Sequence, residues 1–186
     1  MEIIDTKLPD CKILIPKKFE DNRGYFFESW NRSALQIRDV DIDFVQDNHS
    51  FSAAKGTVRG LHYQSPPHAQ DKLVRVVSGE ILDIAVDVRV GSPTYGQWIA
   101  VYLSEENNHQ LLVPKGFLHG FATCKEKVHV TYKCSDVYSS SADGSVRFDD
   151  PDLGIDWKLD RQPILSEKDR KAGSFADFQS PFVFKG

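Results

Sequence analysis

The sequence predicts a mostly β protein, a sandwich or barrel with a few small helices near the two ends of the chain. Two observations predict this class. Apolar and polar residues alternate with a period of two along the middle of the chain, as in half-buried strands. Short turns rich in glycine and proline separate these runs, at residues 78–80, 91–93 and 114–116. With 186 residues, 40% of them hydrophobic, the chain can bury one core.

Four runs carry the alternation, at residues 72–78, 81–88, 98–103 and 128–134. In the second run the even-numbered positions are apolar and share one face, whereas Asp83 and Asp87 lie on the opposite, polar face. In the last run Tyr132 lies on the face that should point inward, with three neighbours: Val128, Val130 and Cys134. We expect these runs to form the walls of the sandwich or barrel.

Two short helices are expected outside the strands. Residues 33–40 fit one of them. The other begins after Ser166, which is followed by Asp169 at the position where a capping box has its acid. Because no linker, repeat or low-complexity tract interrupts the chain, we expect a single domain over residues 1–186, with an N-terminal segment at about 1–45, a barrel core at about 46–150 and a helical C-terminal segment at about 160–186.

Charge and composition argue against several classes of protein. The formal net charge is -4, whereas general nucleic-acid-binding surfaces are basic. No apolar run approaches the length of a membrane span, and the first residues lack the features of a signal peptide. The cysteines are three in number and lack C-x-x-C spacing, so we expect free thiols in a reducing compartment: Cys11, Cys124 and Cys134. A cytoplasmic protein with no nucleic-acid or membrane partner is expected.

Two histidines are the most informative residues. His62 lies within the predicted strand at residues 59–64, and His119 follows a Pro-Lys-Gly turn. This placement resembles the cupin pattern, a double-stranded β-helix or jelly-roll barrel that often holds a metal. Gln64, however, stands where metal-binding cupins have a second histidine, no glutamate follows it, and Thr123 replaces an expected asparagine. Two imidazoles and a carboxamide form a poor site for a divalent metal. We therefore expect no metal and no cofactor, and acid–base chemistry instead.

Further motifs, in order along the whole chain, narrow the assignment. They are residues 21–28, 46–48, 59–64, 72–80, 91–96, 114–121, 132–133 and 165–169. On these motifs the chain resembles the dTDP-4-dehydrorhamnose 3,5-epimerase family. The resemblance implies a metal-free, cupin-like homodimer whose N-terminal strands contribute to the partner's site. It also implies inversion of C3 and C5 of dTDP-4-keto-6-deoxyglucose, on the route to dTDP-L-rhamnose. Both carbons lie next to the 4-keto group, so enolate formation acidifies their C–H protons.

The resemblance implies four catalytic residues. His62 would be the base, because a neutral imidazole can accept a proton near neutral pH. Asp169 would orient His62, Lys72 would face the developing enolate, and Tyr132 would return a proton from the opposite face of the ring. Each position also has a structural alternative: a core histidine bonded to the backbone, a helix-capping acid, a solvated lysine and a buried tyrosine, respectively.

The resemblance implies substrate contacts as well. His119 would hold the sugar or the enolate oxygen, with Asp83 orienting it. Arg23 and Arg59 suit the pyrophosphate, since guanidinium groups bind phosphate oxygens well, and Tyr138 matches an aromatic residue that stacks on thymine. The remaining positions that match substrate contacts in the family are Glu28, Gln46, Asn48, Asp143 and Lys168.

Some positions depart from the family pattern. Cys134 and Ser135 replace two threonines, Val137 replaces one of two tyrosines, and Asp143 replaces a glutamate found in relatives. These changes lie at positions that match contacts to the nucleotide part of the substrate. They therefore bear on which nucleobase is preferred more than on which reaction is catalysed. Three rival functions remain open: inversion at C3 or C5 alone, sugar-nucleotide binding without catalysis, and a metal-dependent cupin oxygenase or isomerase.

Overall fold

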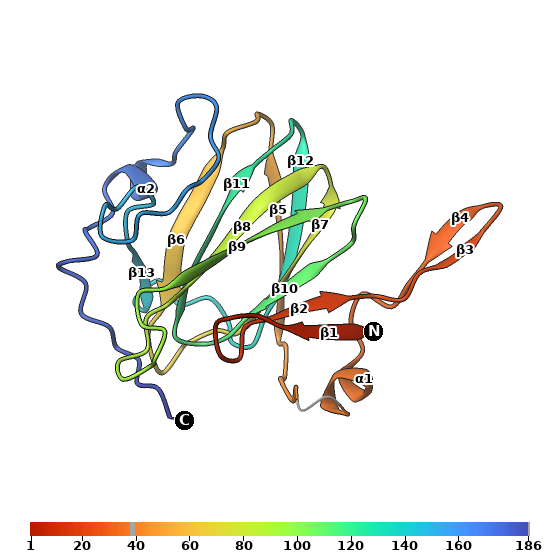
Figure 1. Ribbon diagram of the computed structural model, residues 1–186, viewed down its shortest axis with the longest axis horizontal. Coiled ribbons are helices and arrows are strands. Elements are labelled where there is room, and N and C mark those ends of the chain that lie inside the picture. The colour runs from red at the N-terminus through yellow and green to blue at the C-terminus, as the bar shows by residue number, and fades with distance from the viewer. Residues whose placement is uncertain (38–39, 186) are drawn as a thin grey trace.

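Two antiparallel sheets face each other in the computed structural model, which describes residues 1–37 and 40–185 (Figure 1). The first sheet has six strands, in the spatial order β1 (Glu2–Asp5), β2 (Lys12–Ile15), β10 (Gln110–Val113), β7 (Lys72–Ser78), β12 (Val128–Cys134) and β5 (Gln46–Ser52). The second has five strands, in the order β13 (Asp143–Ser145), β6 (Val58–Gln64), β11 (Phe117–Thr123), β8 (Glu80–Asp87) and β9 (Trp98–Ser104). The alternation predicted this mostly β architecture, and the histidine pattern implied that it would be cupin-like.

The main core fills the space between the two sheets. Alternate residues of β7, β10 and β12 meet alternate residues of β8, β9 and β11 in one apolar cluster. The inward face predicted for β12 is confirmed, since Val128 and Val130 are buried there and Tyr132 packs against them. Apolar burial of this kind is the largest favourable contribution to folding, and it leaves one end of the barrel free for polar side chains.

Strand β8 is buried on both faces, which corrects the prediction of a polar face. Ile81 and Ala85 belong to the core between the sheets, and Asp83 on the same face is 0% exposed. Leu82 and Ile84 point the other way, into a second cluster that includes Trp157 and, from the C-terminal segment, Phe182. The alternation of carboxylates with apolar residues therefore marks a buried polar group inside the barrel and not a solvent-exposed face.

Both helices are shorter than predicted. Helix α1 covers Arg32–Gln36 and is capped by Asn31, and residues 38–39 of the predicted helix lie outside the described residues. Helix α2 covers only Glu167–Arg170. The rest of the described C-terminal segment is not helical, because its backbone pairs with the barrel through bridges such as Thr57 to Ile164 and Val90 to Val183. Among the described residues, neither helix has the length or the apolar content that crossing a bilayer requires.

A hairpin near the N-terminus extends away from the barrel (Figure 1). It consists of β3 (Phe19–Asp21) and β4 (Gly24–Phe26). Phe26 is 68% exposed, and Phe19 and Tyr25 are also largely exposed. The hairpin therefore presents aromatic side chains that this chain by itself does not cover.

Candidate active site

An irregularity between β6 and β11 points both Arg59 and His62 into the barrel. His62 pairs with His119 and Arg59 pairs with Phe121, so two residues of β6 lie opposite the single residue Gly120. Residues three positions apart in a regular strand point to opposite faces. The extra residue of a bulge returns them to the same face. The bulge is therefore what places a guanidinium group and an imidazole side by side in the interior.

Two glycines permit the close approach of these strands. A Cβ atom on Gly60 would lie 2.6 Å from the Cα of Gly120, and one on Gly120 would lie 2.8 Å from the carbonyl oxygen of Arg59. Gly60 also has a φ of +121°, a backbone conformation that side chains disfavour. The pair of glycines thus sets the spacing between the strands that carry the two histidines.

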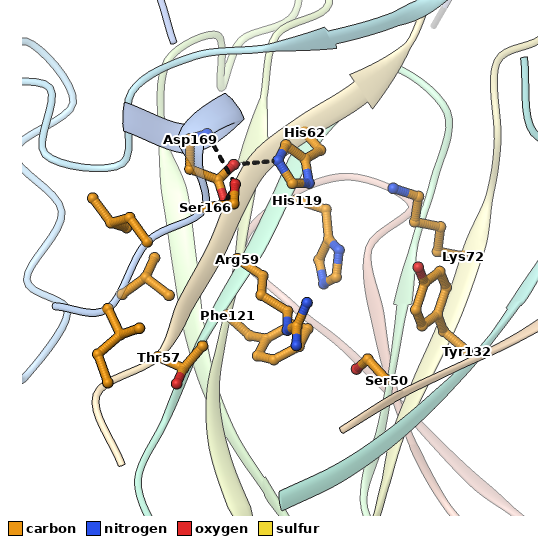
Figure 2. Close-up of a pocket in the computed structure, with 13 residues that line it drawn as sticks. Ser50, Thr57, Arg59, His62, Lys72, His119, Phe121, Tyr132, Ser166 and Asp169 are labelled. Carbon is orange, nitrogen blue, oxygen red and sulfur yellow. Dashed lines mark hydrogen bonds and ion pairs between the residues drawn. The ribbon is translucent and has the colours of Figure 1, made fainter. Parts of the chain in front are cut away.

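A cavity of about 390 Å³ opens between the sheets at this end of the barrel. Figure 2 shows His62 on one side of it, with Lys72 and Tyr132 on the other. The five-stranded sheet also contributes Arg59 and His119. The other lining residues are Ser50, Thr57, Val58, Phe121, Ile164, Leu165, Ser166 and Asp169. All four side chains predicted to be catalytic therefore line a single cavity.

His62 and Asp169 form a hydrogen-bonded pair, with 2.5 Å between Nε2 and Oδ1 (Figure 2). The second carboxylate oxygen accepts a hydrogen bond from the Ser166 hydroxyl at 2.8 Å, and Ser166 Oγ in turn accepts from the Asp169 backbone N–H. Asp169 is thus part of the helix cap and the partner of His62 at once, so the two alternatives left open by the sequence coexist.

The carboxylate also determines which nitrogen of His62 is free. Burial disfavours the charged form of Asp169, but hydrogen bonds from His62 and Ser166 outweigh it and hold the pKa of Asp169 below its usual value. An ionised carboxylate only accepts hydrogen bonds. The Nε2 atom of a neutral His62 therefore carries the proton, and Nδ1 keeps an unshared electron pair for the cavity.

Lys72 and Tyr132 lie on neighbouring strands of the opposite wall. Burial lowers the pKa of the Lys72 ammonium, against the opposing charge of nearby Cys134. Burial raises the pKa of the Tyr132 hydroxyl, Cys134 adds to the shift, and Arg59 opposes it. Tyr132 therefore stays protonated throughout the neutral range, and Lys72 gives up its proton more readily than an exposed lysine.

A second histidine–carboxylate pair lies beside the first. His119 Nε2 and Asp83 Oδ1 are 2.7 Å apart, and both side chains are buried. The other oxygen of Asp83 has no hydrogen-bond partner among the described residues. The only side-chain partner of Asp83 among the described residues is therefore His119, the residue that it was predicted to orient. Asp83 reaches His119 from the inward face of β8, however, and not from a polar face.

A second cavity, of about 340 Å³, adjoins the first. The two share His62, Lys72 and Tyr132. Five of the predicted substrate contacts line the second cavity: Gln46, Asn48, Tyr138, Asp143 and Lys168. Within this group, Lys168 Nζ lies 2.5 Å from Asp143, whose carboxylate also accepts a hydrogen bond from the Tyr138 hydroxyl at 3.2 Å. A cation, a carboxylate and an exposed aromatic ring thus form one wall.

Two predicted contacts lie away from both cavities of this chain. Arg23 is at the tip of the β3–β4 hairpin, where its guanidinium group pairs with Asp21 at 2.6 Å. Glu28 accepts a hydrogen bond from Asn31 and lines a separate hollow beside Met1 and Lys17. Within one chain, neither residue meets His62.

The structure adds lining residues that the sequence analysis did not single out. Ser50 and Phe121 line the first cavity, and the hydroxyl of Ser50 is buried without a hydrogen-bond partner among the described residues. Alternation along β5 would have identified Ser50, because it lies two residues after Asn48 on the same face. Phe121 carried the same signal, because it lies two residues after His119 on the same face of β11.

The donor set around the histidines suits acid–base chemistry. Among residues 1–37 and 40–185, no three His, Cys, Asp or Glu side chains are grouped so that they could hold a metal ion. Gln64, at the position of a metal ligand in other cupins, has its amide oxygen bonded to the Ser139 N–H at 2.8 Å. Lys72, a further cationic side chain, lies in the same cavity.

Comparison with known proteins identifies the family to which this chain belongs. The family model described as dTDP-4-dehydrorhamnose 3,5-epimerase matches residues 5–177. The chain is 48% identical to the protein of that name from Salmonella typhimurium, over 92% of this chain and 94% of the relative. It is 46% identical to a relative from Neisseria gonorrhoeae over 95% of this chain, but spans only 53% of that relative's length.

Solved structures agree in fold. The chain is similar to a dTDP-6-deoxy-D-glucose-3,5-epimerase from Legionella pneumophila, in complex with dTDP-4-keto-L-rhamnose, with a TM-score of 0.94, 43% identity and 98% coverage of both chains. A 3'-monoepimerase from Streptomyces bikiniensis, in complex with dTDP-quinovose, is less similar, with a TM-score of 0.86, 33% identity, and 92% and 86% coverage of this chain and that one. The resemblance seen in the motifs is confirmed, and the chain belongs to the dTDP-4-dehydrorhamnose 3,5-epimerase family.

Proposed function

We propose that this chain inverts C3 and C5 of dTDP-4-keto-6-deoxyglucose by metal-free proton transfer, on the route to dTDP-L-rhamnose. One observation carries the proposal: His62, oriented by Asp169, faces Lys72 and Tyr132 across one cavity (Figure 2). Family membership supports the substrate class. The dTDP-4-keto-L-rhamnose complex of the Legionella pneumophila relative supports a sugar nucleotide as the ligand.

Proton abstraction is the first step. Nδ1 of His62 removes the proton from the carbon next to the ketone, and the electron pair of the broken C–H bond moves to the ketone oxygen, forming an enolate. Asp169 stabilises the imidazolium that results. Lys72 donates a hydrogen bond to the enolate oxygen, an interaction whose loss typically costs about 10²–10³-fold in kcat.

Reprotonation from the opposite face completes the inversion. The Tyr132 hydroxyl gives its proton to the same carbon, and the enolate collapses to the ketone. Tyr132 is then a phenolate and His62 an imidazolium, and transfer of one proton between them through solvent restores the enzyme. Since burial raises the pKa of Tyr132, the acid is present in its protonated form at neutral pH.

The adjoining cavities suggest how the substrate lies. The sugar ring occupies the region that both share, bounded by His62, Lys72 and Tyr132. The nucleoside lies in the second cavity beside Tyr138 and Lys168. A single-centre epimerase is the second candidate, because the chain is also similar to a 3'-monoepimerase, and the number of inverted centres depends on how the ring sits.

We propose that the active form is a homodimer in which the hairpin of one subunit completes the site of the other. The hairpin projects from the barrel with exposed aromatic residues, and it carries Arg23, with Glu28 just beyond it. Both residues lie away from the cavities of their own chain. A second copy would supply the arginine for the pyrophosphate.

A cytoplasmic location is part of the same proposal. The cysteines are all free, as is usual in a reducing compartment: Cys11, Cys124 and Cys134.

His62→Ala should abolish hydrogen exchange at both carbons, because the base is lost. The measurement is NMR of dTDP-4-keto-6-deoxyglucose in heavy water with purified protein, which reports C3 and C5 separately. Wild type should exchange both positions. A variant that still exchanges C3 or C5 at the wild-type rate would refute His62 as the common base.

Tyr132→Phe should leave exchange in place but suppress completed inversion, because abstraction does not need the acid. The same NMR experiment measures both, since returned substrate carries deuterium with unchanged configuration. We expect inversion to fall by about 10²–10⁴-fold, the usual contribution of a positioned acid. Wild-type inversion in this variant would remove Tyr132 from the mechanism.

Lys72→Met should stabilise the fold while impairing catalysis. The pKa of Lys72 is lower in the folded than in the unfolded state, so burial of the charge destabilises the wild type fully below the folded pKa and not at all above about 10.5. Urea denaturation at pH 7 should show a gain on the order of 1 kcal/mol that shrinks as the pH rises toward 10. Lys185→Met, at an exposed position with no ion pair among the described residues, serves as the control and should show neither change. Equal stability of wild type and Lys72→Met at pH 7 would argue against a costly buried charge.

Mixed dimers test the shared site. Arg23→Ala and His62→Ala should each be nearly inactive alone, but co-refolded subunits should recover about one quarter of wild-type activity, because half of the dimers are mixed and one of their two sites is intact. Co-refolding His62→Ala with Lys72→Met is the matched control. Both substitutions lie in the barrel, so every site of every dimer carries one of them and no activity should return. No recovery in the first mixture would show that Arg23 does not act across the dimer.

A further inference from the structure

We propose that Gln64 is a positioning residue for the nucleotide part of the site, and that it acts through Tyr138. The inference rests on the proposed function, because it treats the second cavity as the nucleoside subsite. Gln64 lies two residues after His62 in β6 and is 5% exposed. It stands where other cupins place a metal ligand, and its contacts show a different use of that position.

The carboxamide of Gln64 bonds to the backbone on both sides of Tyr138. Its Nε2 donates to the Val137 carbonyl at 3.2 Å, and its Oε1 accepts from the Ser139 N–H at 2.8 Å. The second hydrogen of Nε2 goes to the carbonyl of His68 at 2.7 Å. A carboxamide has two donor hydrogens and an acceptor oxygen, so this one side chain holds three backbone groups in a buried position.

Tyr138 itself is held at two further points, one on its backbone and one on its ring hydroxyl. Gln46 Oε1 accepts from the Tyr138 N–H at 2.9 Å, and the Tyr138 hydroxyl donates to Asp143 at 3.2 Å. Asp143 is itself the strand partner of Gln64 in the β6–β13 pairing. Tyr138 is 60% exposed, so packing does not fix its ring. These hydrogen bonds therefore set the orientation that a stacked base would meet, with Gln64 anchoring the backbone on either side.

An aromatic ring oriented before binding costs less entropy when a flat ligand stacks on it. Gln64→Leu keeps most of the side-chain volume but leaves the loop around Tyr138 without its anchor. We expect the Kd for dTDP, measured by titration calorimetry, to rise about tenfold, because ordering a loop side chain on binding costs about that factor. The KM for the sugar nucleotide should rise in parallel, and kcat should stay within about twofold, the pattern of a lost ground-state contact.

Two further variants help to separate positioning of Tyr138 from a general loss of stability. Gln64→Glu keeps the acceptor for Ser139 but points a carboxylate oxygen at two carbonyls, so it should also bind dTDP weakly. Asn108→Ala removes a buried amide that donates to the carbonyls of Glu105 and Glu106, in a turn outside both cavities, and should leave dTDP binding unchanged.

The decisive test is a double-mutant cycle. If Gln64 acts through Tyr138, adding Gln64→Leu to Tyr138→Ala should weaken dTDP binding no further, because contacts in one network are not additive. Fully additive losses, or wild-type affinity in Gln64→Leu, would overturn the inference while leaving the proposed function intact. Failure of the wild type to bind dTDP would instead overturn both.

Discussion

The hydrogen bond between His62 and Asp169 is the interaction on which the site depends, because it joins two parts of the chain that are 107 positions apart. β6 supplies the imidazole, and the short helix α2 in the C-terminal segment supplies the carboxylate. The segment reaches the barrel through backbone pairing, with Val58 N–H donating to the Ile164 carbonyl at 3.0 Å. A helix as short as α2 is not stable alone. Here Ser166 caps it, and the same serine fixes the carboxylate that orients the base.

Polar groups in the site cost stability, and the remainder of the barrel compensates for them. Lys72 and Asp83 place ionisable groups among buried neighbours, and such groups are costly unless they are paired. Asp83 has only His119 as a side-chain partner among the described residues. Apolar packing elsewhere offsets this cost, since β8 is buried on one face by the opposite sheet and on the other by the C-terminal segment. The barrel thus concentrates its unfavourable contacts at one end, which is where the proposed chemistry needs them.

Alternation predicted the strands better than it predicted their faces. The strands at residues 72–78 and 128–134 were correct to the residue. The prediction of a solvent-exposed polar face at Asp83 was wrong, because β8 is covered on both sides and has no face in contact with solvent. It could not locate the bulge opposite Gly120 either, and the bulge alone brings Arg59 and His62 to the same side. The helical prediction for the C-terminal segment failed because long-range bridges, which leave no local signal, hold that segment. The catalytic set came from the family motifs and not from spacing.

Position 64 explains how a cupin barrel can favour proton transfer over metal binding. A carboxylate bonded to each histidine does not distinguish a proton-transfer site from a metal site, because metal-binding histidines are also hydrogen-bonded to carboxylates. What differs is the number of converging donors. A structural or catalytic metal needs at least three good ligands, whereas a base needs a single unshared electron pair. The amide of Gln64 is held by Val137, His68 and Ser139 and cannot turn inward without leaving three backbone groups unpaired. The position that carries a metal ligand in other cupins is here committed to the loop that contains Tyr138, and His62 and His119 have no third ligand beside them among the described residues.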